Sequence, residues 1–398
     1  MKPLSEKHLA IEESKTLAIN AKANELKAAG IKIINYSSGE PDFPTPEAIR
    51  QKAIEVIKQG HVRYTATPGI PELKKAIVDK FKTDNGLTYE PNQIIVSSGA
   101  KQSLYNTLQV ICEPGDEVII ASPYWTSYPE LVKLAGATPV FVDTAETDYI
   151  LKAAHVEAAV TNRTKALIIN SPNNPTGAVY NRETLEAIGR VATKHDLFVI
   201  SDEIYEKLIY EGEHHSIASI SDDLYQRTIV VNGLSKAYAM TGWRIGYAAA
   251  SKTLVKLMAN MQSHATSNTN TIAQHAAVEA LTGDQTPVGT MREAFERRRR
   301  VMKEAMDAIP GIKSANARGA FYLMVDVSGL FGKRHEGKEL NDATDVAALW
   351  LEHAHVAVVP GVAFGADHVM RMSYATSEKE ILEGCSRIKS LVESLQSR

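Results

Sequence analysis

The sequence predicts an α/β fold: a large domain with a mostly parallel seven-stranded sheet sandwiched by helices, plus a smaller α+β domain. The chain has 398 residues, which exceeds the size at which one hydrophobic core stops growing, so two domains are expected. From residue 94 onward, short apolar runs rich in β-branched residues alternate with helical stretches. This alternation is typical of a parallel sheet covered on both faces. The runs lie at 94–97, 117–121, 138–142, 166–170, 197–201, 228–232 and 245–250.

The N-terminal segment is expected to form part of the smaller domain. A first helix, which Ser14 can cap, leads into an irregular stretch at 35–46 that contains three prolines. Thr45 and Pro46 then have the residue types of a helix N-cap and first helical position. This second helix is expected to end near Gly60.

The C-terminal part of the chain has a different pattern. The predicted elements are a polar helix at 288–308, strands at 319–327, 355–360 and 368–375, and a final helix from Ser377. We therefore expect residues 46–287 to form the large domain, and residues 1–45 together with 288–398 to form the small one.

Composition and charge exclude several classes of protein. The chain has 44% apolar residues, 23% charged residues and a formal net charge of −3. This balance gives no electrostatic reason to expect binding to nucleic acid or to an anionic membrane. The N-terminus lacks the apolar stretch of a signal peptide, and no segment resembles a membrane span. The two cysteines, Cys112 and Cys385, cannot supply a disulfide framework, so a cytoplasmic location is expected.

Polar motifs follow three consecutive predicted strands, at the point where each strand ends. They are SPNNPTG at 171–177, SDEIY at 201–205 and NGLSK at 232–236. Because open α/β sheets bind ligands beyond the carboxyl ends of their strands, we expect the three motifs to line one pocket. Any one of them alone is compatible with ordinary turn chemistry, but together they supply an amide, a carboxylate, a phenol and an amine.

These groups match the requirements of pyridoxal phosphate. Lys236 lies at the end of a buried strand, where desolvation lowers its pKa and prepares it to form a Schiff base. Asp202 can partner the pyridine nitrogen, although a helix N-cap is an equal interpretation of this residue in isolation. Asn174 and Tyr205 can hydrogen-bond the 3′ oxygen of the ring.

A phosphate site is predicted at the start of another helix. Gly99, Ala100 and Lys101 open this helix, and the free N–H groups of a helix N-terminus bind anions. Arg244 can add a bidentate contact. Trp125 offers a flat face on which the cofactor ring can stack, although a core aromatic is the alternative interpretation.

Other ligand-binding motifs are absent or incomplete. No G-x-G occurs in the chain, which excludes the dinucleotide fingerprint, and segment 332–339 (GKRHEGKE) carries Glu339 where a P-loop needs a hydroxyl. Two histidine pairs, His214–His215 and His353–His355, have no third ligand at convincing spacing. We therefore predict no metal site.

With these motifs the chain resembles the class I, fold-type I pyridoxal-phosphate aminotransferases, and most closely the bacterial aspartate aminotransferases of the Iβ type. The resemblance runs from SSGEPDFPTP at 37–46, through SPNNPTG, SDEIY and SKxxxMTGWRIG, to RMSYATSE at 371–378. It implies a homodimer with shared active sites that exchanges an amino group between aspartate and 2-oxoglutarate by a ping-pong aldimine mechanism. The alternatives are a broader enzyme for aromatic oxo acids or prephenate, and a non-catalytic, effector-binding relative.

The resemblance also implies a role for each matching residue. Lys236 would be the Schiff-base lysine and would carry the proton of the 1,3-shift. Arg371 would hold the substrate α-carboxylate, helped by Asn174 and the backbone of Gly39, with Trp125 beside them. The further cofactor contacts implied are Ser235 and, for the phosphate bound in the neighbouring subunit, Tyr64.

The distal carboxylate of a dicarboxylic substrate needs its own cation. The segment 261–274, where one branch of the family places an arginine, contains none. Lys101 instead matches the lysine that the Iβ type uses, and Ser14 and Thr16 would assist it. The acidic Glu12 near the expected entrance argues against a strong prephenate activity.

Overall fold

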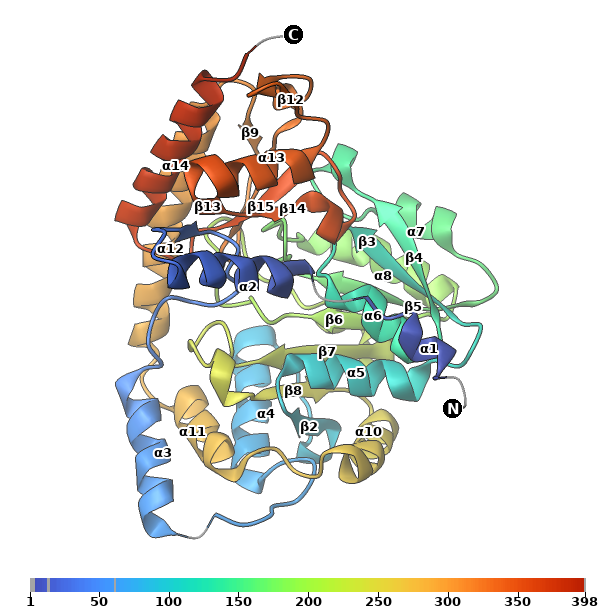
Figure 1. Ribbon diagram of the computed structural model, residues 1–398. Helices are drawn as coiled ribbons and strands as arrows, with labels where there is room; N and C mark the ends of the chain where they lie inside the picture. The colour runs from blue at the N-terminus through green and yellow to red at the C-terminus, as the bar shows by residue number, and fades with distance from the viewer. Residues whose placement is uncertain (1–3, 13–14, 61, 397–398) are drawn as a thin grey trace.

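The computed structural model describes residues 4–12, 15–60 and 62–396 (Figure 1). Its largest sheet has seven strands in the order β2-β8-β7-β6-β5-β3-β4. Only β8 runs antiparallel to its neighbours, so the predicted mostly parallel sheet is confirmed. The strands are β2 (Ile94–Ser97), β3 (Glu117–Ser122), β4 (Thr138–Asp143), β5 (Thr164–Asn170), β6 (Phe198–Asp202), β7 (Thr228–Gly233) and β8 (Gly246–Ala249).

Helices cover both faces of this sheet, which is why its strands are apolar at nearly every position. In β2, Ile95 packs with α5, α6 and α10, whereas Ile94 and Val96 pack with α4 and α11 on the opposite face. The helices of this unit are α3 (Glu47–Gln59), α4 (Pro71–Asn85), α5 (Ala100–Ile111), α6 (Ser127–Leu134), α7 (Ala153–Ala159), α8 (Arg182–Lys194), α9 (Asp222–Arg227), α10 (Lys252–Ala265) and α11 (Thr271–Thr282).

A second, antiparallel sheet lies in the C-terminal part of the chain, in the order β14-β15-β10-β9. Strand β1 of the N-terminal segment pairs in parallel with β13, and α2 lies beside these C-terminal elements (Figure 1). The remaining elements are α1 (Glu6–Leu9), α2 (Lys15–Ala28), β1 (Ile34–Asn35), α12 (Thr286–Asp307), β9 (Lys313–Ser314), β10 (Tyr322–Asp326), β11 (Arg334–His335), β12 (Lys338–Glu339), α13 (Ala343–Leu349), the π-helical turn η6 (Trp350–Ala354), β13 (Val356–Ala357), β14 (Val359–Pro360), β15 (Val369–Ser373) and α14 (Glu378–Glu393).

One predicted helix cap is wrong, and two predicted helix ends are confirmed. Pro46, not Thr45, occupies the N-cap position of α3 and makes no side-chain cap. The hydroxyl of Thr45 instead donates to the backbone oxygen of Ala239 at 2.7 Å, which ties the preceding loop to the segment after β7. Gly60 ends α3 with a φ of 72°, and Ser377 caps α14.

Some expectations are not decided by these elements. Ser14, the expected cap of the first helix, lies outside the described residues. The bounds of the two domains stay a prediction. Within the part of the chain that the structure describes, no helix combines the length and the apolar character needed to span a membrane.

Candidate active site

The three predicted polar loops leave the sheet side by side, because β6 lies between β5 and β7. Asn170 at the end of β5 is opposite Asp202 at the end of β6. The side-chain amide of Asn170 donates to the backbone oxygen of Asp202 at 2.9 Å, and the N–H of Ser171 donates to the same oxygen at 3.2 Å. The loops after β5 and β6 are therefore fastened to each other where they leave the sheet.

Asp202 is a buried carboxyl group with two donors directed at it. The phenol of Tyr128 donates to its Oδ2 at 2.6 Å, and the N–H of Ile204 donates to its Oδ1 at 3.2 Å. Burial raises the pKa of Asp202 to about 6, and the hydrogen bond from Tyr128 limits the rise. The group can therefore be ionised at neutral pH and can still accept a hydrogen bond from a protonated ligand atom.

Lys236 lies just beyond β7 and is half-buried. Its Nζ donates to the backbone oxygen of Gly39 at 2.5 Å. Burial lowers the pKa of Lys236 to about 8, the charge of Glu40 opposes this shift, and the charges of Arg371 and Arg244 add to it. A substantial neutral fraction near pH 8 is what a lysine needs to act as a nucleophile.

Arg371, on β15, is a buried guanidinium, with 3% of its surface exposed. Its Nη1 donates to Oδ1 of Asn174 at 3.1 Å and its Nη2 donates to the backbone oxygen of Ser37 at 2.8 Å. The Nε of Arg371 is buried without a partner, and among the described residues no carboxylate lies within ion-pair distance of this side chain. Buried charges in proteins are normally paired, so this arginine is suited to an anionic ligand.

Two tyrosines that the sequence analysis did not single out complete this region. Tyr322, on β10, hydrogen-bonds Tyr205 through their hydroxyl oxygens at 2.9 Å, and its ring lies 4.4 Å from the guanidinium carbon of Arg371. Tyr128 binds Asp202, as described above. No motif in the sequence marks Tyr128, which lies on α6 just after Trp125.

The guanidinium of Arg244 lies against the start of α5, where the sequence analysis places a phosphate site. The guanidinium of Arg244 donates to the backbone oxygen of Ser98 at 3.3 Å, and a Cβ on Gly99 would lie 2.3 Å from its Nη2. A Cβ on Gly246 would lie 2.1 Å from the backbone nitrogen of Ala100. Glycine at both positions therefore lets the arginine and β8 approach the first turn of α5, whose first two N–H groups, on Ala100 and Lys101, precede the first acceptor of the helix.

Lys101 and Trp125 lie at the outer rim of the same region. The Nζ of Lys101 is 4.9 Å from the ring centroid of Trp125, and that ring packs edge-on against Tyr128 at 5.3 Å. Desolvation and the charge of Arg244 lower the pKa of Lys101. Within the described residues this lysine has no ion-pair partner, so its charge is available to a ligand.

The remaining predicted residues are less tightly grouped. Ser235 is buried next to Lys236, whereas the side chain of Tyr64 is 92% exposed. Thr16 lies on α2, but its side chain, like the whole of Ser14, lies outside the described residues.

Known proteins resemble this chain over nearly its whole length. The family described as aminotransferase class I and II matches residues 31–388. The chain belongs to this family.

Named relatives and solved structures resemble this aminotransferase closely. An aspartate aminotransferase from Bacillus sp. (strain YM-2) is 50% identical over 381 residues, which cover 95% of this chain and 96% of that protein. An aspartate/prephenate aminotransferase from Thermus thermophilus is 45% identical over 391 residues, covering 97% and 98% of the two chains. The crystal structure of the aspartate aminotransferase from Rhizobium meliloti matches with a TM-score of 0.96 and 42% identity over 100% of both chains. That of the Thermus thermophilus aspartate aminotransferase with maleate matches with a TM-score of 0.93 and 45% identity, covering 98% of this chain and 100% of that one.

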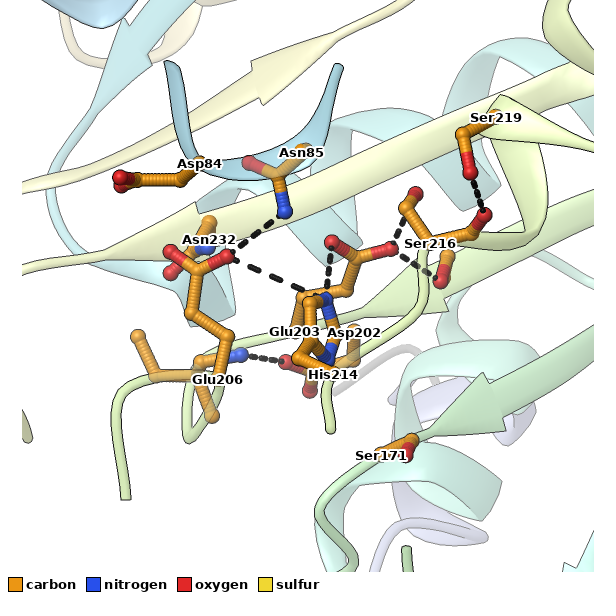
Figure 2. Close-up of polar contacts among 12 residues, drawn as sticks. Asp84, Asn85, Ser171, Asp202, Glu203, Glu206, His214, Ser216, Ser219 and Asn232 are labelled. Atoms are coloured by element: carbon orange, nitrogen blue, oxygen red, sulfur yellow. Dashed lines mark hydrogen bonds and ion pairs between the residues drawn. The ribbon is translucent and has the colours of Figure 1, made fainter. Parts of the chain in front are cut away.

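A second buried polar network lies behind Asp202 in this aminotransferase (Figure 2). The carboxylate of Glu203 accepts from Ser216 at 2.6 Å and lies 3.0 Å from Nε2 of His214. The carboxylate of Glu206 forms an ion pair with Lys80 of α4. Although burial opposes the shift, the charges of Lys80 and His214 lower the pKa of Glu206 to about 2. The turn that carries Asp202 and Tyr205 is therefore fastened to α4 by buried charges.

Replacing Lys80 with methionine is expected to lower the free energy of unfolding by about 3–5 kcal/mol, because Glu206 would remain buried without its cation. Urea unfolding of the apoprotein measures this. The matched control is Lys75→Met on the same helix, where the ion pair with Asp79 is largely exposed and should contribute no more than about 1 kcal/mol. Equal losses in the two variants would contradict the assignment of a buried, stabilising pair.

Proposed function

We propose that this aminotransferase uses pyridoxal phosphate and exchanges an amino group between aspartate and 2-oxoglutarate in a ping-pong reaction. The single observation that carries the proposal is Arg371, a buried guanidinium without a carboxylate partner among the described residues. Its charge lowers the pKa of Lys236, so the two side chains lie within electrostatic reach of each other. A carboxylate-binding cation beside a nucleophilic amine suits an amino-acid substrate.

The residues present fit the cofactor. A phosphate matches the donors at the first turn of α5 and Arg244, which the glycine contacts allow to approach each other. A pyridine N–H matches the buried carboxylate of Asp202. The further groups that we assign to the cofactor are the amine of Lys236, the indole of Trp125, the side chains of Asn174, Tyr205 and Ser235, and Tyr64 of the second subunit.

When bound, pyridoxal phosphate supplies an electron sink that makes the Cα–H bond of an amino acid labile. Lys236 would hold this group covalently, and its Nζ, when free, would accept the Cα proton and return it to the other carbon of the 1,3-shift. Its pKa of about 8 suits both steps near neutral pH. Asp202 would keep the ring nitrogen protonated, and Arg371 would orient the α-carboxylate through its planar guanidinium.

The distal carboxylate of the substrate is assigned to Lys101. In support, the matching Thermus thermophilus structure is an aspartate aminotransferase with maleate, a dicarboxylate. Lys101 has no ion-pair partner among the described residues and extends over Trp125 at the rim of the site. A cation in this place would favour dicarboxylic substrates over uncharged ones.

The Lys101→Ala variant tests this assignment. We expect it to weaken transition-state binding of aspartate and glutamate by about 1.5–3 kcal/mol, the value of a charged hydrogen bond, and to leave phenylalanine unchanged. The measurement is kcat/KM for each half-reaction, followed by cofactor absorbance. In the wild-type enzyme, equal rates for alanine and aspartate would contradict the role of Lys101, and fast prephenate turnover would favour the broader activity.

The remaining assignments concern assembly, domains and location. We propose a homodimer in which Tyr64 enters the neighbouring active site, supported by the 92% exposure of this large aromatic side chain. Residues 46–287 form the large domain, and 1–45 with 288–398 the small one, supported by the pairing of β1 with β13. A cytoplasmic location is supported by two buried free cysteines, Cys112 and Cys385.

A further inference from the structure

Two groups of histidine and carboxylate side chains bring three possible metal ligands together among the described residues. The first is Glu203, Glu206 and His214, which lie close to Asp202 (Figure 2). Its carboxylate oxygens already accept hydrogen bonds from neighbouring side chains or form ion pairs with them. Their partners are Ser201, Ser216, Asn85, Lys80 and His214 itself. A cation there would have to displace Lys80, so this group is a structural ion-pair network.

The second group, His335, Glu336 and His353, has free donors. One ligand atom of each lies within 4.8 Å of the other two, and the two imidazole rings are 4.4 Å apart between centroids. The Nε2 of His335 is buried and has no hydrogen-bond partner among the described residues. Within the described residues, Glu336 and His353 form no side-chain hydrogen bond or ion pair. None of the side chains that the structure describes therefore competes for these three donors.

The backbone that carries these side chains includes an energetically unfavourable left-handed residue. Glu336 and Gly337 form the two-residue turn between β11 and β12, with φ angles of 48° and 83°. A glutamate rarely adopts a left-handed conformation, which Gly, Asn or Asp favour in such turns. His353 lies in η6, a π-helical turn that continues α13, and π-helical turns occur frequently at functional sites.

The two cationic side chains of the hairpin each have a carboxylate nearby, which reduces their repulsion of a bound metal ion. Arg334 pairs with Glu339 at 2.9 Å, and Lys338 lies 4.0 Å from Asp345. The free side chains of this hairpin are therefore an imidazole and a carboxylate.

We propose that His335, Glu336 and His353 bind a divalent transition-metal ion of the Zn²⁺ type. Two imidazoles and one carboxylate are a common zinc ligand set, and they leave a fourth position for water or an added ligand. Ligand atoms around tetrahedral zinc lie about 3.4 Å apart, so the three donors need to approach one another by up to about 1.4 Å through side-chain rotation. The ion clamps the hairpin β11–β12 to the turn η6.

The position of this clamp connects it to the rest of the fold. His353 is two residues before His355, whose backbone oxygen accepts a hydrogen bond from Ile34 at 2.9 Å where β1 joins β13. Beyond β1, the same segment supplies the backbone oxygen of Ser37 to Arg371. A metal ion at the hairpin is therefore expected to stabilise the C-terminal unit without contacting the active site.

Titration of the full-length holoenzyme with Zn²⁺, after removal of metal with a chelator, tests the proposal by calorimetry. We expect one ion per chain and a rise in the thermal midpoint, because the ligands are brought together only in the folded state. His353→Ala should bind at least about tenfold more weakly, since even the loss of an outer-shell partner has that effect. His264→Ala, which changes an exposed histidine on α10, is the matched control and should bind as the wild type does.

Glu336→Gly separates metal binding from folding. Glycine relieves the left-handed backbone, so this variant should be at least as stable as the wild type without metal and yet bind Zn²⁺ more weakly. No uptake of Zn²⁺ by the wild-type enzyme would overturn the proposal. Unchanged affinity in both His335→Ala and His353→Ala would overturn it as well.

Discussion

Replacing Lys236 with alanine is expected to slow transamination by about 10²–10⁴-fold or more, the range attributed to a positioned proton-transfer group. The loss includes the covalent attachment as well as the proton shuttle, because both use the same Nζ. The amine is suited to these steps because burial lowers its pKa to about 8. Single-turnover reaction with aspartate, followed by the absorbance of the cofactor, measures the loss.

The Lys236→Arg variant is the matched control for charge. A guanidinium keeps the positive charge but neither forms an imine nor accepts a proton near neutral pH, so this variant should be as slow as the alanine variant. In the wild-type enzyme, borohydride reduction followed by peptide mass spectrometry should find the cofactor attached to Lys236. Attachment to a different lysine, or full activity of either variant, would disprove the assignment.

Replacing Arg371 with leucine is expected to lower kcat/KM for aspartate. The corresponding loss of transition-state stabilisation is about 2–5 kcal/mol, the effect of removing one partner from a buried, hydrogen-bonded charge pair. The stability of the apoprotein should change much less. Removing an unpaired buried guanidinium relieves several kcal/mol of desolvation, whereas the acceptors on Asn174 and Ser37 lose a donor at about 1–3 kcal/mol each. These opposing effects nearly cancel, so thermal unfolding of the apoprotein and steady-state kinetics should respond differently.

A second buried arginine provides the comparison. Arg299 on α12 is 6% exposed, but it donates to Glu211 and to the backbone oxygen of Ala317, both at 2.7 Å. Arg299→Leu should therefore lower the stability of the protein and leave kcat/KM of the folded enzyme nearly unchanged. If Arg371→Leu destabilises the apoprotein as much as Arg299→Leu does and retains its kcat/KM, Arg371 is structural and our substrate assignment is wrong.

The positions of Asp202 and Lys236 were predictable because each lies at the carboxyl end of a strand: Asp202 is the last residue of β6, and Lys236 lies three residues beyond β7. A parallel sheet aligns the carboxyl ends of its strands, so Asp202 and Lys236 had to emerge at the same edge once β6 and β7 were recognised as neighbours in the chain. The helix N-terminus at Gly99 was predictable for a similar reason, since this glycine stands between a predicted strand and a predicted helix.

The side chains that adjust these groups were not predictable in the same way. Tyr128 acts on Asp202 from α6, and Tyr322 acts on Tyr205 and Arg371 from a strand of the second sheet. Their sequence positions indicate a core aromatic as readily as a hydrogen-bond partner. The cap expected at Thr45 was wrong for a related reason: a contact with Ala239, distant in sequence, provides its hydrogen bond.

By itself the sequence determined the alternation of strands and helices, the edge of the sheet at which the site lies, and the family. Local patterns carry this information because side-chain period and turn chemistry depend on neighbouring residues. Only the tertiary structure decided which charges are paired. Lys80 forms an ion pair with Glu206, whereas Arg371 has no carboxylate partner among the described residues. It also brought His335 next to His353. Burial and pairing depend on contacts between segments far apart in the chain, and these contacts determine pKa values and ligand sites.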